Sequence, residues 1–427
     1  VRPLRSVFKF SKGLTITKEN LQDEGVLCVN YGEIHSRYGF RLNPSFCPLR
    51  CVASDYLLTN PTALVRDGDF VFADTSEDLE GSGNFTHLRS ENPIFAGYHT
   101  IIARPRNCFK SLFLAYHIDS SYFRSQIQKQ VKGVKVFSIS QGILKSAKCS
   151  LPSLSEQTAI AEFLDRETGK IDELVAEQRR LIELLKEKRQ AVISHAVTKG
   201  LNPHAPMKPS GIEWLGDVPE HWETRTIAKA STKITNGYVG PTRDILVESG
   251  TPYVQATHIK KGRVNFDDGY FVTPEWSKSH AKSILAEGDV LIVQTGAGTG
   301  DVGLVSCNEV GFNCHALIIV ASAKELLSGA YLASILQSDY GHQKLESIQT
   351  GGMHPHLNCG NVKFVEIPLP PLAEQTAIID FLETETAKFD TLTAEAERAI
   401  HLLQERRTAL ISAAVTGQID VRQQLHN

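Results

Sequence analysis

The sequence lacks several features that would place it in a familiar class. No apolar run approaches the ~20 residues that span a bilayer, so we expect no membrane association. The first residues, VRPLRSVFKFSKG, lack the apolar centre of a signal peptide, which argues against export. The eight cysteines are scattered and form no CxxC pair. This spacing favours reduced thiols in a cytoplasmic protein over disulfides or a zinc site.

Signatures of catalysis are missing as well. The sequence contains no Walker A pattern, no HExxH, no GxSxG and no NPPY or DPPY of the methyltransferase type. Residues 298–303 form a GxGxxG, but a strand-like run follows where a dinucleotide site needs a helix, so we interpret it as a turn. His354 and His356 lack a nearby Cys or acidic partner, which predicts no metal site. We therefore expect no catalytic residue, cofactor or metal in this chain.

The chain also lacks an overall excess of positive charge. Its 45 Lys and Arg residues stand against 48 Asp and Glu residues, a net charge of -3. Only residues 1–150 are basic, with 19 Lys and Arg against 13 Asp and Glu, whereas residues 207–368 have 13 against 17. If the chain binds DNA, a partner should supply part of the phosphate contacts that dominate affinity.

An internal repeat is the main feature that the sequence does contain. Residues 151–198 recur at 369–416, displaced by 218 positions, and 29 of the 48 aligned residues are identical. Both copies follow a Pro-containing lead and are rich in strong helix formers. Ser153 and Glu156 fit a capping box at the start of the first copy. Each copy is predicted to form one long helix.

Apolar residues recur along both copies with a period of 3.5 residues. This period is typical of a left-handed coiled coil, so we expect the two helices to pair with each other. A long amphipathic helix packed only on its own domain is the alternative. The predicted seam consists of Ile160, Leu164, Ile171, Leu174, Leu181, Leu185, Val192, Ile378, Leu382, Phe389, Leu392, Leu403 and Leu410.

The segments that precede the two helices resemble each other weakly. Residues 26–34, 69–75 and 98–105 have strand patterns and 112–127 a helical one, and similar patterns recur from 251 to 345. The alignment places Val254 on Val29 and His315 on His99. The order predicts an α+β chain with an internal pseudo-two-fold repeat. Two similar globular α/β domains, residues 1–150 and 207–368, are separated by two long antiparallel coiled-coil helices, residues 151–206 and 369–427.

Two similar scaffolds with divergent surfaces suit recognition of two different targets. Polar and basic side chains in loops are the groups that pair with base edges and phosphates. Taken singly, each is equally well explained as a solvated surface residue. The DNA-binding candidates are Asn30, Tyr31, Arg37, Thr75, Ser76, Arg104, Arg106, Lys129, Lys132 and Lys135 in the first domain, and Tyr238, Gln255, His258, Lys260, Lys261, Arg263, Thr295, Thr299, His354 and His356 in the second.

Three stretches resemble the conserved regions of the specificity (S) subunits of type I restriction-modification systems: IPLPPLAEQTAIIDFLETETAKFDTL, LPSLSEQTAIAEFLDRETGKIDEL and SGIEWLGDVPEHWE. The resemblance covers both halves. It implies a non-enzymatic subunit whose two target recognition domains read the halves of a bipartite, asymmetric site in double-stranded DNA. The helix pair would set the spacing and dock two modification (methyltransferase) subunits, which carry S-adenosylmethionine. Restriction (endonuclease and translocase) subunits, which use ATP and Mg²⁺, are the further partners implied.

One departure from the family pattern concerns the beginning of the sequence. A counterpart of SGIEWLGDVPEHWE usually precedes the first domain, so either this leader is missing or the numbering begins after it. Three alternatives explain the duplication less well: an enzyme that binds a nucleotide at 298–303, a protein-binding coiled-coil scaffold without DNA sequence preference, and a solitary specificity chain that competes for modification subunits. The bases that are read and the spacer length do not follow from the sequence, because loop geometry and DNA shape decide them.

Overall fold

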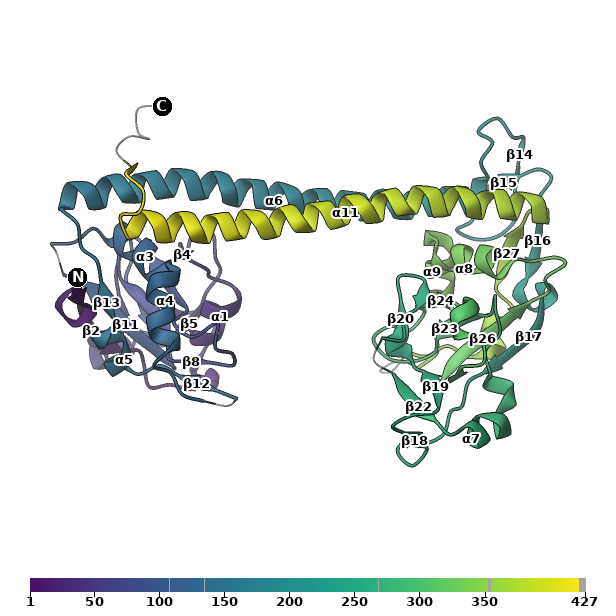
Figure 1. Cartoon of the computed structure of the whole chain (residues 1–427), viewed down its shortest axis with the longest axis horizontal. Helices are drawn as coiled ribbons and strands as arrows, with labels where there is room; N and C mark the ends of the chain where they lie inside the picture. Colours follow the sequence, from purple (N-terminus) through teal and green to yellow (C-terminus); the bar gives the residue numbers. More distant parts are fainter. Residues whose placement is uncertain (107, 134, 268, 352–354, 422–427) are drawn as a thin grey trace. The chain divides into compact units, whose positions relative to one another are not determined.

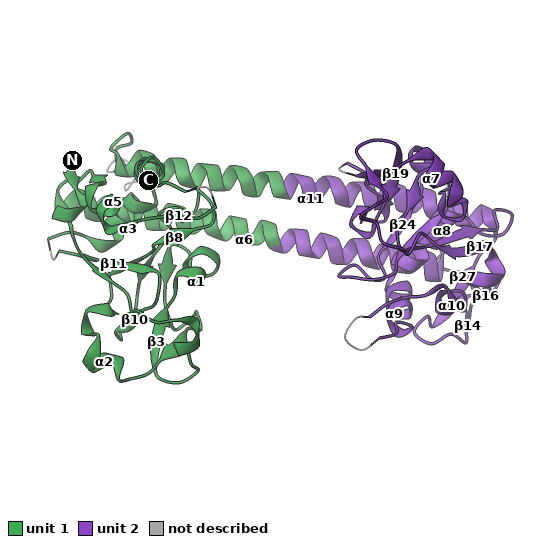
Figure 2. Cartoon of the chain, turned by 90° about the horizontal axis from the view of Figure 1, so that it is seen from below, with its two compact units in different colours: residues 1–179, 397–427 green, residues 180–396 purple. Residues whose placement is uncertain are grey.

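The computed structural model describes residues 1–427 except 107, 134, 268, 352–354 and 422–427. The chain divides into two compact units (Figure 2): residues 1–179 with 397–427 form unit 1, and residues 180–396 form unit 2. Helix α6 (Leu154–Lys199) begins in unit 1 and ends in unit 2, whereas α11 (Leu372–Val415) begins in unit 2 and ends in unit 1. The predicted α+β fold, with two similar domains and two long helices, is confirmed. No helix in the described ranges has the length and apolar character needed to cross a bilayer.

Unit 1 is built on a five-stranded sheet in the order β2-β11-β7-β9-β4 and a four-stranded sheet in the order β5-β3-β10-β6 (Figure 1). The strands of the first sheet are β2 (Phe8–Lys12), β4 (Arg41–Leu42), β7 (Phe70–Ala73), β9 (Phe85–Leu88) and β11 (Thr100–Pro105). Those of the second are β3 (Val26–Val29), β5 (Arg50–Val52), β6 (Leu64–Val65) and β10 (Ile94–Ala96). Two short pairs join β1 (Arg2–Pro3) to β13 (Lys148–Cys149) and β8 (Thr75–Ser76) to β12 (Phe137–Ser138). The helices are α1 (Tyr31–Ser36), α2 (Tyr56–Thr59), α3 (Ser111–Asp119), α4 (Ser121–Gln128) and α5 (Gln141–Ser146).

Unit 2 follows the same plan with a six-stranded sheet, β17-β26-β23-β24-β21-β20, and a four-stranded sheet, β18-β22-β19-β25. The first contains β17 (Ser231–Asn236), β20 (Ile259–Lys260), β21 (Arg263–Val264), β23 (Val290–Val293), β24 (Val302–Leu304) and β26 (Leu317–Ser322). The second contains β18 (Leu246–Val247), β19 (Thr251–Val254), β22 (Tyr270–Val272) and β25 (Asn313–Cys314). Further pairs are β14 (Met207–Pro209) with β15 (Asp217–Pro219) and β16 (Glu223–Thr226) with β27 (Glu366–Leu369). The helices are α7 (Pro274–Ser279), α8 (Gly329–Gln337), α9 (Asp339–Ser347) and α10 (Cys359–Val362).

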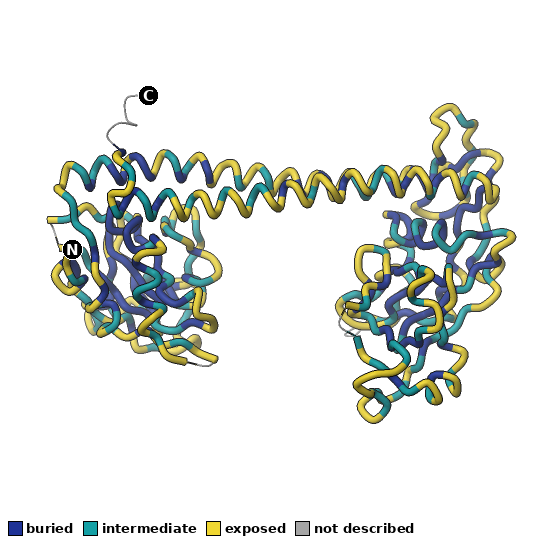
Figure 3. Tube along the Cα trace, in the orientation of Figure 1, coloured by how far each residue is buried: buried dark blue, intermediate teal, exposed yellow. Residues whose placement is uncertain are grey.

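The central strand of each unit is buried on both faces (Figure 3). In unit 1, Phe70 and Phe72 of β7 point to a core shared with α3 and the long helices, while Val71 and Ala73 point to the second sheet. Strand β23 alternates in the same way between α8 and the second sheet of unit 2. Each core also includes the start of one long helix and the end of the other. The duplicated helices therefore belong to the cores of both units.

The strand alignment of the two domains is correct at Val29 and Val254, because β3 and β19 each pair in parallel with the corresponding strand, β10 or β25. It is wrong by one residue at His99. His99 and Ala316 have left-handed φ angles of 54° and 47° and directly precede β11 and β26. His99 thus corresponds to Ala316 and not to His315, because the connection before β26 is one residue shorter.

Two predicted elements are each divided in the structure. The strand expected at 26–34 ends before Asn30, which is extended and precedes α1. The helix expected at 112–127 is two helices, α3 and α4, separated by Ser120 with a ψ of 148°. The Ser120 hydroxyl accepts a hydrogen bond from the backbone N of Phe123 at 3.3 Å and so caps α4. Ser338 caps α9 in the same way.

The predicted capping box at the start of α6 is confirmed. The backbone N of Ser153 donates to Glu156 Oε2 at 3.0 Å, and the backbone N of Glu156 donates to Ser153 Oγ at 3.3 Å. Two hydrogen-bond donors that the first turn of a helix leaves without partners are satisfied in this way.

One glutamine in each copy attaches the long helix to its own domain. Gln157 Oε1 accepts from the backbone N of Lys110, just before α3, at 3.1 Å. Gln375, 218 residues later, accepts from the backbone N of Ser328, just before α8, at 2.8 Å. Both side chains are almost completely buried. The glutamine therefore docks each long helix on its own domain.

The buried stripe of the long helices keeps the predicted period of 3.5 residues. Of the two seam positions in each heptad, however, one is occupied by a different residue from the one predicted. Leu174, Leu181 and Leu392 are 45%, 42% and 46% exposed, which corrects their assignment to the seam. Val175 and Ile182, one residue later, lie further inside. Val175 and Ile182 are as apolar as the leucines that precede them, so hydrophobicity alone did not show which of the two faces the partner helix. The other predicted seam residues are buried or half-buried: Ile160, Leu164, Ile171, Leu185, Val192, Ile378, Leu382, Phe389, Leu403 and Leu410.

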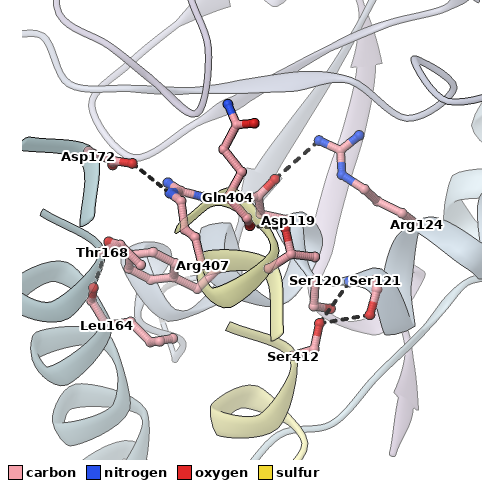
Figure 4. Close-up of polar contacts among 12 residues, drawn as sticks. Asp119, Ser120, Ser121, Arg124, Leu164, Thr168, Asp172, Gln404, Arg407 and Ser412 are labelled. Atoms are coloured by element: carbon pink, nitrogen blue, oxygen red, sulfur yellow. Dashed lines mark hydrogen bonds and ion pairs between the residues drawn. The ribbon is translucent and has the colours of Figure 1, made fainter. Parts of the chain in front are cut away.

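An arginine of one long helix meets an aspartate of the other in both units, which shows that the helices run antiparallel there. In unit 1, Arg407 donates from Nε to Asp172 at 2.9 Å and from Nη1 to Asp119 at 3.2 Å (Figure 4). In unit 2, Arg189 faces Asp390 at 3.7 Å. Each residue of the second pair lies 218 positions from its counterpart in the first. Burial disfavours the charge of Arg407, but the two carboxylates outweigh burial and raise its pKa.

We expect Arg407→Ala to destabilise unit 1 by about 2 kcal/mol, because it removes one of the two arginines that pair with Asp119, which is only 16% exposed, and leaves Arg124 as the other. The matched change Arg189→Ala should cost less than about 1 kcal/mol, since Asp390 is 65% exposed. Thermal unfolding followed by circular dichroism measures both variants. Equal losses of stability in the two variants would contradict the conclusion that Arg407 stabilises unit 1 through its ion pairs with Asp119 and Asp172.

Candidate nucleic-acid interface

Two segments of unit 1 lie side by side at the end of the central strand β7. Thr75 in β8 pairs with Ser138 in β12, and the backbone O of Asp74 accepts from the backbone N of Ile139 at 2.7 Å. The predicted residue Thr75 is thus placed next to the segment that follows Lys135. Ser76 pairs in the same short ladder but is buried.

The corresponding segments of unit 2 meet in the same way. Thr295 forms an antiparallel bridge with His356, and the backbone O of Gln294 accepts from the backbone N of Leu357 at 2.9 Å. The hydroxyl of Thr350 lies 3.1 Å from His356 Nε2. Two predicted candidates, Thr295 and His356, are therefore brought together. His354 lies outside the described residues.

A group of aromatic and polar side chains adjoins these segments in unit 1. The ring centroid of Tyr31 lies 5.4 Å from that of Tyr98 and 5.3 Å from that of His99. His99 Nδ1 is 3.1 Å from Asp74 Oδ1, and His35 Nε2 is 2.8 Å from the backbone O of Thr75. His99 is exposed, so its ring can present a donor or an acceptor to a ligand. The arrangement offers hydrogen-bonding edges on a surface held by the sheet.

Unit 2 has a larger aromatic group around His315, which bridges to Tyr238 and lies two residues before Leu317, the partner of Val293 at the end of β23. Trp276 stacks on His280 with 4.0 Å between ring centroids, and Tyr238 lies 5.0 and 5.1 Å from these two rings. Tyr253 Oη is 3.3 Å from His315 Nδ1. Burial lowers the pKa of His315, and its hydrogen bond with the backbone of Tyr238 raises the pKa by less. The net pKa is therefore lowered, and the ring is neutral at pH 7. A neutral imidazole keeps one acceptor nitrogen.

Sequence reasoning missed most of these aromatic residues. Tyr98, His99, Trp276, His280 and His315 were not among the candidates. Each is recognisable only through partners that are distant in sequence, such as Tyr31 for the first two and Tyr238 or Tyr253 for the others. The four-residue spacing of Trp276 and His280 was the single local signal.

Three predicted residues are engaged inside the protein. Arg104 donates to both carboxylate oxygens of Asp69 at 2.7 to 3.0 Å, because this 3% exposed carboxylate needs a charged partner. Asn30 is 1% exposed. His258 is buried, and its Nδ1 accepts from the backbone N of Gln255 at 2.8 Å. The structure thus corrects the expectation that Asn30, Arg104 and His258 present side chains to DNA.

The remaining candidates are exposed or half-exposed but do not form one surface. Arg106 follows the end of β11 opposite to His99. Lys261 and Gly262, with φ angles of 50° and 79°, form the tip of the β20–β21 hairpin. The exposed cations are Arg37, Arg106, Lys129, Lys132, Lys135, Lys260, Lys261 and Arg263, and the half-exposed residues include Tyr31, Tyr238, Gln255 and Thr299.

The glycine-rich sequence at 298–303 is a turn, as predicted. It joins β23 to β24, which pair in antiparallel fashion with Ile292 opposite Val302. A strand and not a helix follows the last glycine, so the geometry of a dinucleotide site is missing. Within the described part of the chain, no group of three or more His, Cys, Asp or Glu residues is arranged to hold a metal ion.

Comparison with known proteins identifies similar chains over nearly the whole length. A family model described as the type I restriction modification DNA specificity domain matches residues 1–184 and 215–401. The type I restriction enzyme EcoKI specificity subunit of Escherichia coli (strain K12) is 22% identical, over 100% of this chain and 90% of the relative. The MjaVIII specificity subunit of Methanocaldococcus jannaschii is 21% identical over 87% and 84%. A solved structure concerning complex assembly and conformational transition of the type I R-M system matches with a TM-score of 0.70 at 16% identity, covering 97% of this chain and 96% of that one. This last likeness concerns the fold.

Proposed function

We propose, on the premise that this chain belongs to the type I restriction-modification DNA specificity family, that it reads a bipartite, asymmetric site in double-stranded DNA. The chain is a specificity subunit with two DNA specificity domains, and such a subunit is not the catalytic one. The finer proposal assigns one half-site to each domain. The observation that carries it is that both units bring the same two segments together beside an aromatic group.

Different side chains on equivalent segments support an asymmetric target. Thr75 faces Ser138 in unit 1, whereas Thr295 faces His356 in unit 2. Base edges in the major groove present distinct donor and acceptor patterns, so different hydroxyl and imidazole groups select different bases. The two domains should therefore recognise unlike half-sites.

The long helices are proposed as the spacer between half-sites and as the docking surface for two modification subunits. Exposed leucines on both helices, including Leu174, Leu184 and Leu402, support a docking role because they are large apolar side chains left in solvent. In this proposal the modification subunits carry S-adenosylmethionine, and restriction subunits add ATP and Mg²⁺ chemistry. The complex would work in the cytoplasm, where its partners supply phosphate contacts that an acidic second domain lacks.

DNA contact by unit 1 is tested by replacing Lys129, Lys132 and Lys135 together with Gln in the complex with a cognate modification subunit. All three lysines are exposed and belong to the end of α4 and the connection that leads to β12, the strand that pairs with β8. If they contact phosphates, the slope of log Kobs against log salt should fall by about 0.9 for each contact, without a change in sequence preference.

The control for this experiment replaces three other exposed lysines of the same domain, Lys9, Lys18 and Lys110, with Gln. It removes the same charge elsewhere and should leave the slope unchanged. A lysine triple variant that behaves like the control would remove this segment from the DNA interface.

A further inference from the structure

The charges at the junction between the domain and the long helices are paired in unit 1. Tyr116 Oη lies 3.1 Å from Asp165 Oδ1 and 3.1 Å from Thr168 Oγ1, both on α6. Arg41 of β4 donates to the same Asp165 at 2.7 Å. On α11, Arg407 is neutralised by Asp119 and Asp172, as described above. Each cation at this junction thus has a carboxylate partner.

The same junction differs in unit 2 at two residues of α8. Ser334 stands 218 positions after Tyr116, and Gln337 stands 218 positions after Asp119. The tyrosine that fills the junction is replaced by a small residue, and the aspartate that neutralises the arginine is replaced by a neutral amide. A cavity of about 460 Å³ at this junction is lined among others by Arg189, Lys261, Arg263, Ser334, Gln337 and Glu383. The cavity of about 660 Å³ at the junction of unit 1 is lined by the mutually paired Asp119, Asp172 and Arg407.

The cations around this cavity lack strong carboxylate partners. Arg189 Nε is buried and makes no hydrogen bond with any residue that the structure describes, and the carboxylate of Asp390 is 3.7 Å away and 65% exposed. Arg263, which occupies the strand position of Arg41, makes no ion pair among the described residues. Lys261 is placed at the cavity by the left-handed turn of the hairpin. A buried donor of a charged group left unpaired is costly, which favours an anionic ligand.

A second cavity, of about 470 Å³, continues the basic surface on the other side of the hairpin. It shares Arg189, Lys261 and Gln337 with the first and adds Lys260 and His342. Its wall includes residues 300 and 301 of the loop that carries the candidates Thr295 and Thr299. The basic cavities therefore adjoin the proposed base-reading loop of unit 2.

Three carboxylates also line these cavities and limit where an anion can lie. Glu309 accepts from the backbone N and Oγ of Ser306 at 2.8 and 2.7 Å, so its charge is engaged in a local cap. Glu383 lines the first cavity and Asp301 the second. Arg189 and Lys261 border both cavities, so the anion should bind against these two residues.

We propose that the cavity at Arg189 and Lys261 binds a phosphate group, at a site whose arginine in unit 1 is neutralised by two carboxylates. A guanidinium and an ammonium group supply charge-assisted hydrogen bonds to phosphate oxygens. The backbone of bound DNA is one source of this phosphate, and this assignment rests on the proposed function, because the adjoining loop is the one assigned to base reading. A free phosphate has the same chemistry and is the other source.

The test uses Arg189→Gln and Lys261→Asn, each of which removes one charge. Asparagine tolerates a left-handed φ better than most residues, so the hairpin should keep its turn. In the complex with a modification subunit, each variant should reduce the salt slope of DNA binding by about 1. In the full chain alone, inorganic phosphate at constant ionic strength should raise the melting temperature of unit 2 in the wild type and not in the variants. All three tryptophans, Trp214, Trp222 and Trp276, lie in unit 2, so their fluorescence reports its unfolding.

A third variant separates ligand binding from a structural role. Gln337→Asp gives Arg189 the carboxylate that Arg407 has in unit 1, so it should stabilise unit 2 while abolishing its response to phosphate. Glu383→Gln should strengthen that response by removing the opposing charge. A merely structural role for Arg189 predicts no change in phosphate response in either variant.

The results distinguish this inference from the function on which it builds. If the variants Arg189→Gln and Lys261→Asn lose the response to phosphate but keep the salt slope of DNA binding, the site binds a free phosphate and not the DNA backbone. If Arg189→Gln and Lys261→Asn leave both the salt slope of DNA binding and the response to phosphate unchanged, the phosphate site is overturned. Sequence-specific binding by the wild type would then still support the proposed function. Absence of sequence preference in the wild type would overturn the function, and the phosphate response would still decide the site.

Discussion

Removal of one heptad from each long helix should shorten the gap between the two recognised half-sites by about three base pairs, at a helical rise of ~1.5 Å per residue and ~3.4 Å per base pair. Suitable segments are residues 176–182 and 397–403, which lie between the ion pairs Asp172–Arg407 and Arg189–Asp390 along their helices. Both pairs, and the apolar stripe, keep their register because one full heptad is removed from each helix. The half-site sequences themselves should not change.

The control for the heptad deletion removes the segment from α6 alone. This change shifts one helix against the other by a full heptad, so Asp172 no longer meets Arg407, and the complex should lose affinity without gaining a new defined spacing. Selection of bound duplexes from a random pool measures the gap in each case. An unchanged gap in the paired deletion would refute the role of the helices as a ruler.

Acidification should unfold unit 1 before unit 2. Burial lowers the pKa of His117 from 6.5 to about 4, and burial together with Arg41 and Arg89 lowers the pKa of His87 to about 3. Each histidine is neutral in the folded state, whereas the unfolded state takes up a proton below pH 6.5. The stability that these neutral histidines contribute is therefore fully present above pH 6.5. It is lost as the pH falls towards about 4 for His117 and about 3 for His87. At about 1.4 kcal/mol per pKa unit, each histidine costs roughly 3 kcal/mol by pH 4.

Unit 2 has apolar residues at the two corresponding positions, Leu304 and Ile335, so its sensitivity to acid is smaller and comes from the half-buried His315, whose pKa burial also lowers. On lowering the pH from 7 to 4, circular dichroism should show a loss of structure while tryptophan fluorescence, which reports unit 2, stays native. The double variant His87→Leu, His117→Ile should move the acid transition of unit 1 to lower pH. Simultaneous unfolding of the two units in the wild type, or an unchanged transition in the variant, would contradict this account.

The duplicated helices were predictable from sequence because their signal is local and repeated. A period of 3.5 residues and a capping box depend only on neighbours along the chain, and Ser153 and Glu156 form the predicted contacts. The exact phase of the seam was not predictable at Leu174 and Leu181, because adjacent Val175 and Ile182 are equally apolar. Only the partner helix decides which of the two faces inward.

The candidate interface was predictable in part. Thr75, Thr295 and His356 lie in loops that follow or precede recognisable strands, and the structure brings these loops together. Arg104 was misplaced because its partner, Asp69, lies across the strand pair β7 and β11, a contact that no local pattern reveals. The unpaired charge at the junction of unit 2 was not predictable for the same reason. It follows from Ser334 and Gln337 standing where unit 1 has Tyr116 and Asp119, next to helices that are distant in sequence.

The most direct test of the proposed function is selection of bound duplexes from a random pool by this chain together with a cognate modification subunit. The account predicts enrichment of two short, unlike motifs separated by one fixed gap. Each motif should respond to changes in one domain only, at Thr75 and Ser138 for one and at Thr295 and His356 for the other. Recovery of the intact complex with no enriched motif would contradict the account and favour a protein-binding scaffold.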